Sequence, residues 1–267
     1  MLKKTIWPIF LILGLLLCYY SVFIEPNKLE ITNYTIQDES LQGIKIVFAS
    51  DFHIKPNQQK RLEKIVELIN LQNPDLVLSA GDFVCGHLKH TTMPPEDIAN
   101  GLGKIKSKYG IYTTLGNHDL WHDIQKFTKA LENNNIKVLN NSNKKLLING
   151  KTLYIAGIQY KPENMLQISK AIENTQKPTI MLTHSPDEFK KIPQDYVNLI
   201  LAGHTHGGQI RIPFIGSLFT ASSYGDKYAK GFIEEDGKKM ITTTGIGTSI
   251  LPIRFNCPPE IVVIEFK

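Results

Sequence analysis

The chain of 267 residues is poor in cysteine and has no long run of charge of either sign. None of its three cysteines belongs to a Cys-x-x-Cys pair, which excludes a zinc ribbon and a thioredoxin-type motif. Cys18 lies in an apolar stretch, so a disulfide between Cys85 and Cys257 is the pairing that the sequence leaves open. Lysine plus arginine number 30 against 25 for aspartate plus glutamate, and basic residues adjoin only in pairs. We therefore expect no nucleic-acid-binding arm.

The N-terminal region contains an uncharged apolar segment, residues 5–24, which has about the length that a membrane-spanning helix needs. Lys3 and Lys4 precede it, and Tyr19 and Tyr20 lie near its far end, where aromatic residues favour the membrane interface. The positive-inside rule then places the short N-terminus in the cytoplasm and the rest of the chain across the membrane.

Two processed forms compete with an uncleaved anchor. A signal peptide requires a small-x-small cleavage pattern, which residues 18–23 do not provide. A lipoprotein would have a small residue before its cysteine, but Leu17 precedes Cys18. We therefore predict a single-pass anchor over residues 1–26 in the cell (inner, cytoplasmic) membrane and one extracytoplasmic domain over residues 27–267.

The domain alternates strand and helix patterns without repeats or low-complexity tracts. Buried apolar runs predict strands, helical periodicity predicts helices, and Asn149-Gly150 predicts a tight hairpin turn. The predicted strands cover 44–50, 75–80, 111–115, 146–148, 152–156, 179–182, 197–202, 241–244 and 261–266, and the helices cover 59–71, 95–107 and 122–133. This order predicts an α/β fold with a mixed sheet or two packed sheets.

Polar side chains follow the predicted strands at the edge where α/β sheets form their binding crevice. They are Asp51, His53, Asp82, Asn117, His118, Asp119, His184, His204 and His206. Carboxylate oxygens combined with imidazole nitrogens suit Mn²⁺, Fe or Zn²⁺ better than Mg²⁺ or Ca²⁺. The set is too large for one tetrahedral ion, so we expect two divalent ions with a bridging carboxylate.

The ordered motifs resemble those of the calcineurin-like metallophosphoesterases. They read Asp51-x-His53, Gly81-Asp82, Gly116-Asn117-His118-Asp119, His184 and Gly203-His204-x-His206. The continuation Gly207-Gly208-Gln209 and residues 252–260 resemble a membrane-associated bacterial branch. That branch includes phosphodiesterases and enzymes similar to UDP-2,3-diacylglucosamine pyrophosphatases. The resemblance implies two mixed β-sheets sandwiched between helices.

The resemblance also implies a role for each motif residue. Asp51, His53 and His206 would hold one metal, and Asn117, His184 and His204 would hold the other, with Asp82 bridging them. His118 would act on the leaving oxygen, and Asp119 would fix its orientation and tautomer.

The substrate is the least determined part of the prediction. Arg211 and Arg254 are candidates for binding a second phosphate or a head group, and each is equally a candidate for a structural ion pair. Phe214 and Phe219 lie in the apolar stretch 210–219, which either receives an acyl chain or packs on the core.

We expect a hydrolase of phosphodiester or diphosphate bonds, acting on a lipid-linked or nucleotide-linked envelope substrate. The alternatives are a UDP-2,3-diacylglucosamine pyrophosphatase of lipid A biosynthesis and a metal-binding scaffold without catalysis. Intact motifs, including His118 and Asp119, favour the enzyme over the scaffold.

Overall fold

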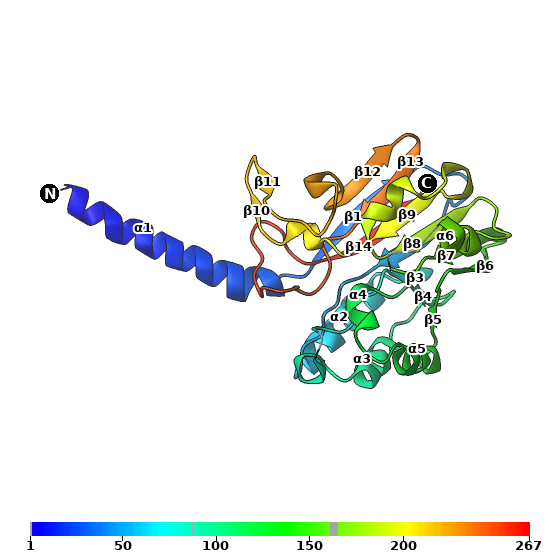
Figure 1. Ribbon diagram of the computed structural model, residues 1–267, viewed down its shortest axis with the longest axis horizontal. Coiled ribbons are helices and arrows are strands. Elements are labelled where there is room, and N and C mark those ends of the chain that lie inside the picture. Colours follow the sequence, from blue (N-terminus) through cyan, green and yellow to red (C-terminus); the bar gives the residue numbers. More distant parts are fainter. Residues whose placement is uncertain (1, 87, 161–164) are drawn as a thin grey trace.

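Two six-stranded mixed sheets pack face to face between helices in the computed structural model, which describes residues 2–86, 88–160 and 165–267 (Figure 1). The first sheet has the order β1 (Glu30–Ile36), β14 (Glu260–Phe266), β2 (Lys45–Phe48), β3 (Leu76–Ser79), β4 (Ile111–Thr113) and β5 (Ile136–Val138). The second has the order β12 (Gly231–Glu235), β13 (Lys238–Thr242), β9 (Leu199–Ala202), β8 (Thr179–Thr183), β7 (Lys151–Gly157) and β6 (Ser142–Ile148). The predicted fold class is confirmed.

Most neighbouring strands are parallel, and antiparallel pairs occur towards the edges. In the first sheet β14 pairs antiparallel with β2, and in the second the outer pairs β12–β13 and β6–β7 are antiparallel. The β6–β7 turn is Asn149-Gly150, with both residues at positive φ, as the hairpin prediction requires. A separate short hairpin consists of β10 (Arg211–Ile212) and β11 (Gly216–Ser217).

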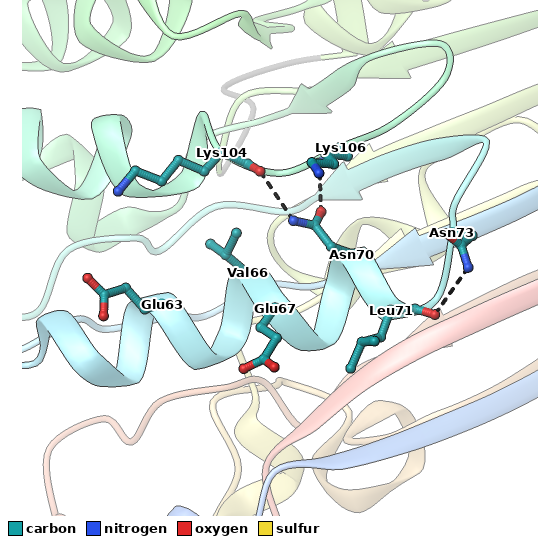
Figure 2. Close-up of a pocket in the computed structure, with 8 residues that line it drawn as sticks. All are labelled: Glu63, Val66, Glu67, Asn70, Leu71, Asn73, Lys104 and Lys106. Atoms are coloured by element: carbon teal, nitrogen blue, oxygen red, sulfur yellow. Dashed lines mark hydrogen bonds between the residues drawn. The ribbon is translucent and has the colours of Figure 1, made fainter.

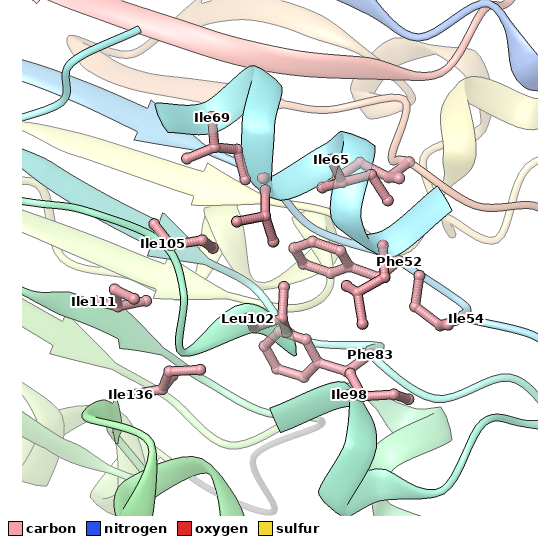
Figure 3. Close-up of a cluster of buried hydrophobic side chains, with 14 of the residues drawn as sticks. Phe52, Ile54, Ile65, Ile69, Phe83, Ile98, Leu102, Ile105, Ile111 and Ile136 are labelled. Atoms are coloured by element: carbon pink, nitrogen blue, oxygen red, sulfur yellow. The ribbon is translucent and has the colours of Figure 1, made fainter. Parts of the chain in front are cut away.

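Alternating side chains along the strands create separate apolar layers. Ile46 and Phe48 of β2 point between the two sheets, whereas Val47 points to the helix-covered outer face. The outer face of the first sheet is covered by α2 (Gln59–Leu71), α3 (Pro95–Leu102) and α5 (Ile124–Asn133), and Figure 3 shows the cluster between them. On the second sheet, α6 (Met165–Ala171) covers the opposite outer face.

The apolar cluster on the first sheet reaches the predicted site through two phenylalanines. Phe52 and Phe83 follow the motif residues Asp51 and Asp82, and their rings stack with centroids 5.2 Å apart (Figure 3). Each motif therefore has its polar side chains on one side of the backbone and a buried ring on the other. Burial of these rings, each worth about 1.5–3 kcal/mol, pins the polar loops to the sheet.

The N-terminal segment forms α1 (Leu2–Tyr19), which projects from the domain and continues through helical turns to Asn27 (Figure 1). Within the described residues, Trp7–Asn27 is long and apolar enough to cross a membrane, and its side chains are almost entirely outside the protein core. Among the described residues, the last turns of this segment contact the domain. Ser21 and Glu25 are buried there, and the Glu25 carboxylate accepts a hydrogen bond from the Cys257 backbone N–H at 2.5 Å.

Some predicted boundaries were wrong. The helix expected over 95–107 ends at Leu102 because Gly101 and Gly103 weaken its C-terminal turn. The three cysteines are free, so the disulfide between Cys85 and Cys257 that the sequence left open is not formed. Strands β1, β5 and β12 and helix α6 were not predicted.

Candidate metal centre

The backbone of the motif loops turns sharply where the strands end. Many motif residues adopt a left-handed backbone, which non-glycine residues rarely do and which clusters at functional sites. They are Asp51 (φ 54°), His53 (φ 43°), Asp82 (φ 55°), His204 (φ 71°) and His206 (φ 51°). The turns bring side chains from β2, β3, β8 and β9 to one place, so the convergence predicted from the sequence is observed.

The first group of candidate ligands is Asp51, His53 and His206, and all three side chains are buried. The Nε2 atoms of the two histidines lie 3.0 Å apart, and Asp51 Oδ1 lies 3.6 Å from His206 Nε2. Burial lowers the pKa of His53 to about 3 and lowers that of His206 well below its ordinary value. Both rings are therefore neutral at pH 7, the form in which imidazole binds a metal.

The second group is Asp82, His184 and His204, joined by Asn117 from the start of α4 (Asn117–Leu120). His184 Nε2 lies 3.0 Å from Asn117 Oδ1 and 3.1 Å from His204 Nδ1. His184 Nδ1 donates to the Ala80 carbonyl at 2.8 Å, which leaves Nε2 directed into the group. A backbone carbonyl that orients an imidazole in this way is typical of metal-binding histidines.

Asp82 connects the two groups. Its Oδ2 lies 3.5 Å from His53 Nε2 and 3.3 Å from His184 Nε2, while Oδ1 accepts a hydrogen bond from the His118 backbone N–H at 2.8 Å. Burial alone would raise the pKa of Asp82, but the surrounding histidines, His184 foremost, hold it well below its ordinary value. The position is the one expected of a carboxylate shared between two cations.

The oxygen and nitrogen atoms that these side chains offer as ligands fit divalent cations. Asp51 Oδ2 is buried and has no hydrogen-bond partner among the described residues, although Oδ1 accepts from the His204 backbone N–H at 2.9 Å. A buried carboxylate oxygen without a partner is costly unless a cation covers it. In the metal-free protein, burial accordingly raises the pKa of Asp51 to about 7.

Glycines let the strands' polar ends approach each other closely. A Cβ atom at Gly116 would overlap the Asp82 carboxylate, and one at Gly203 would overlap that of Asp51. The glycines of these motifs are therefore required by the packing of the site and not only by its turns.

His118 forms a third group with His53 and Asp82, whose side chains are also close enough to hold a cation. Its Nδ1 accepts a hydrogen bond from the Gly86 backbone N–H at 3.3 Å, so the neutral ring carries its proton on Nε2. That atom lies 4.0 Å from Asp82 Oδ2, and the ring packs edge-on against His53. His118 therefore directs an N–H donor towards Asp82 and the other candidate ligands.

Asp119 does not hold His118 as predicted. Its carboxylate is fully buried and accepts backbone hydrogen bonds from Asp82 at 2.7 Å, Phe83 at 2.9 Å and Gly116 at 3.0 Å. Asp119 thereby ties the loop after β3 to the loop after β4. The orienting contact to His118 comes instead from Gly86, whose carbonyl in turn contacts His122 Nε2 at 2.9 Å.

Both arginines of the substrate prediction are engaged by the protein itself. Arg211 forms a two-pronged ion pair with Asp226, at 2.6 and 2.8 Å, which is the structural alternative that the sequence left open. Arg254 is fully buried and donates to the carbonyls of Thr244, Gly247 and Cys257. Its Nη2 also lies 3.5 Å from His206 Nδ1, so Arg254 supports the loop behind a candidate ligand.

Phe214 and Phe219 lie in and just after the β10–β11 hairpin, outside both groups of candidate ligands. Their exposed fractions are 109% and 74%, which excludes the alternative in which they pack on the core.

Two aromatic side chains near the site were missed by sequence reasoning. The Tyr160 ring lies 5.3 Å from those of His184 and His204, and the Trp121 ring lies 4.0 Å from that of His118. Tyr160 follows β7 by three residues, so the rule that polar side chains gather after parallel strands applies to it too. Trp121 follows the Asn-His-Asp motif directly and carried no comparable signal.

A surface pocket of about 500 Å³ on the outer side of α2 is separate from this centre (Figure 2). There Asn70 donates to the Lys104 carbonyl and accepts from the Lys106 backbone N–H. The lining residues contain no histidine or cysteine, so we assign the pocket no part in the chemistry.

Two packed sheets with Asp, Asn and His side chains clustered after their strands form the arrangement expected of a metallophosphoesterase. The model of the calcineurin-like phosphoesterase family matches residues 44–208, so the chain belongs to that family and is a phosphoester hydrolase whose His and Asp clusters fit divalent metals.

Relatives of known name share most of the chain. It is 29% identical over 259 residues to the metallophosphoesterase YkuE of Bacillus subtilis, covering 93% of this chain and 89% of YkuE. It is 27% identical over 254 residues to the phosphodiesterase YaeI of Escherichia coli, covering 92% and 91%. A transmembrane protein with a metallophosphoesterase domain from Danio rerio is 29% identical over 245 residues, covering 86% of this chain and 54% of the relative.

Proposed function

We propose that the protein is a membrane-anchored phosphodiesterase that uses two divalent ions, Mn²⁺, Zn²⁺ or Fe, to hydrolyse phosphodiester or diphosphate bonds of a lipid-linked or nucleotide-linked envelope substrate. The observation that carries the two-ion site is the position of Asp82 Oδ2, 3.5 Å from His53 Nε2 and 3.3 Å from His184 Nε2. The naming of YaeI as a phosphodiesterase supports the bond class.

The proposed ligands divide as the two groups do. Asp51, His53 and His206 hold one ion, and Asn117, His184 and His204 hold the other, with Asp82 shared. Ions bound there would lower the pKa of a bound water and would neutralise charge on the phosphate oxygens.

The chain's own residues supply orientation and a hydrogen-bond donor to the leaving group. Asp119 fixes the loops that carry Asp82 and Asn117, so the ligands are in place before substrate arrives. His118 presents its Nε2–H to the leaving oxygen, because Gly86 occupies Nδ1. A hydrogen bond from this N–H stabilises the negative charge that develops on the leaving oxygen.

A preference for diesters follows from charge. Two divalent ions, two carboxylates and one hydroxide leave one net positive charge, which complements a diester better than a monoester dianion. Arg211 and Arg254 would be the sources of extra positive charge, and both are engaged by Asp226 or by backbone carbonyls.

A comparison of the hydrolysis of an aryl phosphate diester with that of its monoester tests this function. The full chain, in detergent with Mn²⁺ or Zn²⁺, should hydrolyse a bis-aryl phosphate faster than the corresponding monoester, and Asp82→Asn should remove both activities. Equal or faster turnover of the monoester would contradict the diester preference. A phospholipid and UDP-2,3-diacylglucosamine, assayed side by side, identify the substrate class.

The proposed location is the cell membrane, with one pass through residues 5–24 and the domain outside the cytoplasm. The exposed apolar surface of Trp7–Asn27 supports the anchor, and Lys3 and Lys4 support its orientation. Reporter fusions at the C-terminus test the orientation: a periplasmic or extracellular reporter should be active and a cytoplasmic one inactive.

A further inference from the structure

We propose that the domain carries a bilayer-docking surface around the foot of α1, formed by apolar side chains that insert into the leaflet where α1 leaves the membrane. The docking surface consists of Phe214, Ile215, Leu218, Phe219, Ile250 and Leu251. This inference rests on the membrane anchor of the proposed function.

Hydrogen bonds join the docking surface to the end of α1. The Arg254 backbone N–H donates to Ser21 O at 2.9 Å, and Phe255 N–H donates to Gln209 O at 2.9 Å. The Gln209 side chain donates in turn to Leu251 O at 3.0 Å. The hairpin, the C-terminal loop and the helix foot therefore form one unit, and Figure 1 shows β10 and β11 at the end of the domain from which α1 emerges.

The side chains on this unit are unusually apolar for an exposed surface. Phe214 is 109% exposed and Ile250 is 91% exposed, and the other members of the surface range from 52% to 74%. No acidic residue occurs in 209–224 or 246–259. A cluster of large exposed apolar residues marks a binding surface, and the lack of carboxylates lowers the cost of burying this surface in lipid.

The backbone conformation at the two most exposed positions also supports the docking surface. Phe214 has φ 68° and Ile250 has φ 61°, in the left-handed region where glycine or asparagine is favoured and a β-branched residue is an outlier. Each loop thus places a large apolar side chain at a strained position in full contact with solvent. Such a combination is costly in a soluble loop and is explained by insertion of the side chain into lipid.

Continuity with α1 identifies lipid as the occupant. Phe23 and Ile24, in the last turns of the helical segment, are 61% and 45% exposed and lie beside Ser21, which contacts the C-terminal loop. The apolar surface of the anchor therefore continues into the docking surface. Side chains at that level lie within reach of the headgroup and acyl boundary, into which interfacial segments insert by about 5–10 Å.

Docking would also place the catalytic cluster near the membrane surface. His206 is three residues before Gln209, at the base of the hairpin, and Arg254 Nη2 lies 3.5 Å from its ring. A substrate whose phosphate lies in the headgroup layer would then reach the site without leaving the bilayer.

Quenching by brominated lipid tests the docking surface in the full chain. The protein is reconstituted into phosphatidylcholine vesicles with or without dibrominated acyl chains. In the Trp7→Phe background, Trp121 remains as a constant signal, and Phe214→Trp or Leu251→Trp adds one probe. We expect each added probe to lose at least about half of its emission in brominated vesicles, as burial at interfacial depth requires.

Leu147→Trp is the matched control, because Leu147 is 67% exposed on β6, in the edge hairpin at the opposite end of the domain from α1 (Figure 1). Quenching of the two probes no stronger than that of Leu147→Trp would overturn the docking surface. A blue-shifted probe insensitive to bromine would overturn it in favour of a protein partner. In the parent chain, Trp7 reports on the membrane anchor of the proposed function. Its quenching by brominated lipid shows that α1 is inserted even where the docking surface is not.

Discussion

At the scale of single residues, His184 and His118 both direct Nε2 towards the cluster and differ in what holds Nδ1. His184 Nδ1 donates to a carbonyl, so loss of the Nε2 proton leaves a lone pair for a metal, whereas His118 Nδ1 accepts from an amide N–H, so its Nε2 keeps a proton. We infer that this contrast divides metal binding from hydrogen-bond donation without any difference in residue type.

Replacement of His118 tests that division. His118→Ala should lower turnover of a diester by about 10²- to 10³-fold, the usual cost of removing one hydrogen-bond donor to developing charge, with bound metal unchanged. Metal content is measured by inductively coupled plasma mass spectrometry on the purified variant. His90→Ala, on an exposed loop, is the control and should keep full activity. Unchanged turnover in His118→Ala would show that the assigned role is wrong.

Metal loading should release protons. In the metal-free protein, burial opposes the charged form of His184, but Asp82 raises its pKa to about 9, and burial raises that of Asp51 to about 7. His184 is therefore charged at pH 7 and Asp51 is partly protonated, and both must lose protons to bind a cation. Affinity should rise with pH up to about 9.

Calorimetric titration in buffers of different ionisation enthalpy measures this release. At pH 7 we expect about one proton or more per protein to be released as metal binds, and fewer above pH 9. Metal binding with no proton release at pH 7 would contradict the protonation states assigned to the pair.

At the scale of strands and loops, the site is built by close approach of strand ends. Gly116→Ala should lower metal affinity by at least about tenfold, because the added Cβ displaces the Asp82 carboxylate, and a shift of that size corresponds to about 1.4 kcal/mol. Gly116 has an extended backbone that alanine accepts, so the effect arises from the contact alone. Gly14→Ala, with open space around the new Cβ, is the matched control. Metal titration of the two variants compares them.

The strands that carry the site could be predicted because they are buried on both faces and read as continuous apolar runs, as in Leu76–Ser79. The edge strands Glu30–Ile36 and Gly231–Glu235 alternate with polar residues and gave no comparable run. The site residues could be predicted for a related reason, since they directly follow those buried strands.

Other features of the site arise from contacts between segments far apart in sequence. Asp119 binds amides around Asp82, 37 residues earlier, and no local pattern indicates this. Arg254 reaches His206 across a loop whose path the sequence does not predict. The orientation of His118 by Gly86 is of the same kind.

At the scale of the whole molecule, the N-terminal helical segment and the rest of the chain are joined by specific contacts across residue 26. Glu25 is 2% exposed, and its carboxylate accepts the Cys257 N–H. Glu25→Ala should leave that amide without a partner, at a cost of about 1–3 kcal/mol, and lower the melting temperature by several degrees. Circular dichroism during heating measures the shift. Glu67→Ala, an exposed position on α2, should change it little.

The buried foot of the helix has a practical consequence for anyone who wishes to work with a soluble form. A version that starts at Asn27 would discard Ser21 and Glu25, and with them the hydrogen-bond acceptors of the Arg254 and Cys257 backbone N–H groups. The loop behind His206 would then lose part of its support, and weak activity in such a version would reflect where it was cut and not the competence of the enzyme. Detergent-solubilised protein that keeps residues 1–26 avoids this error.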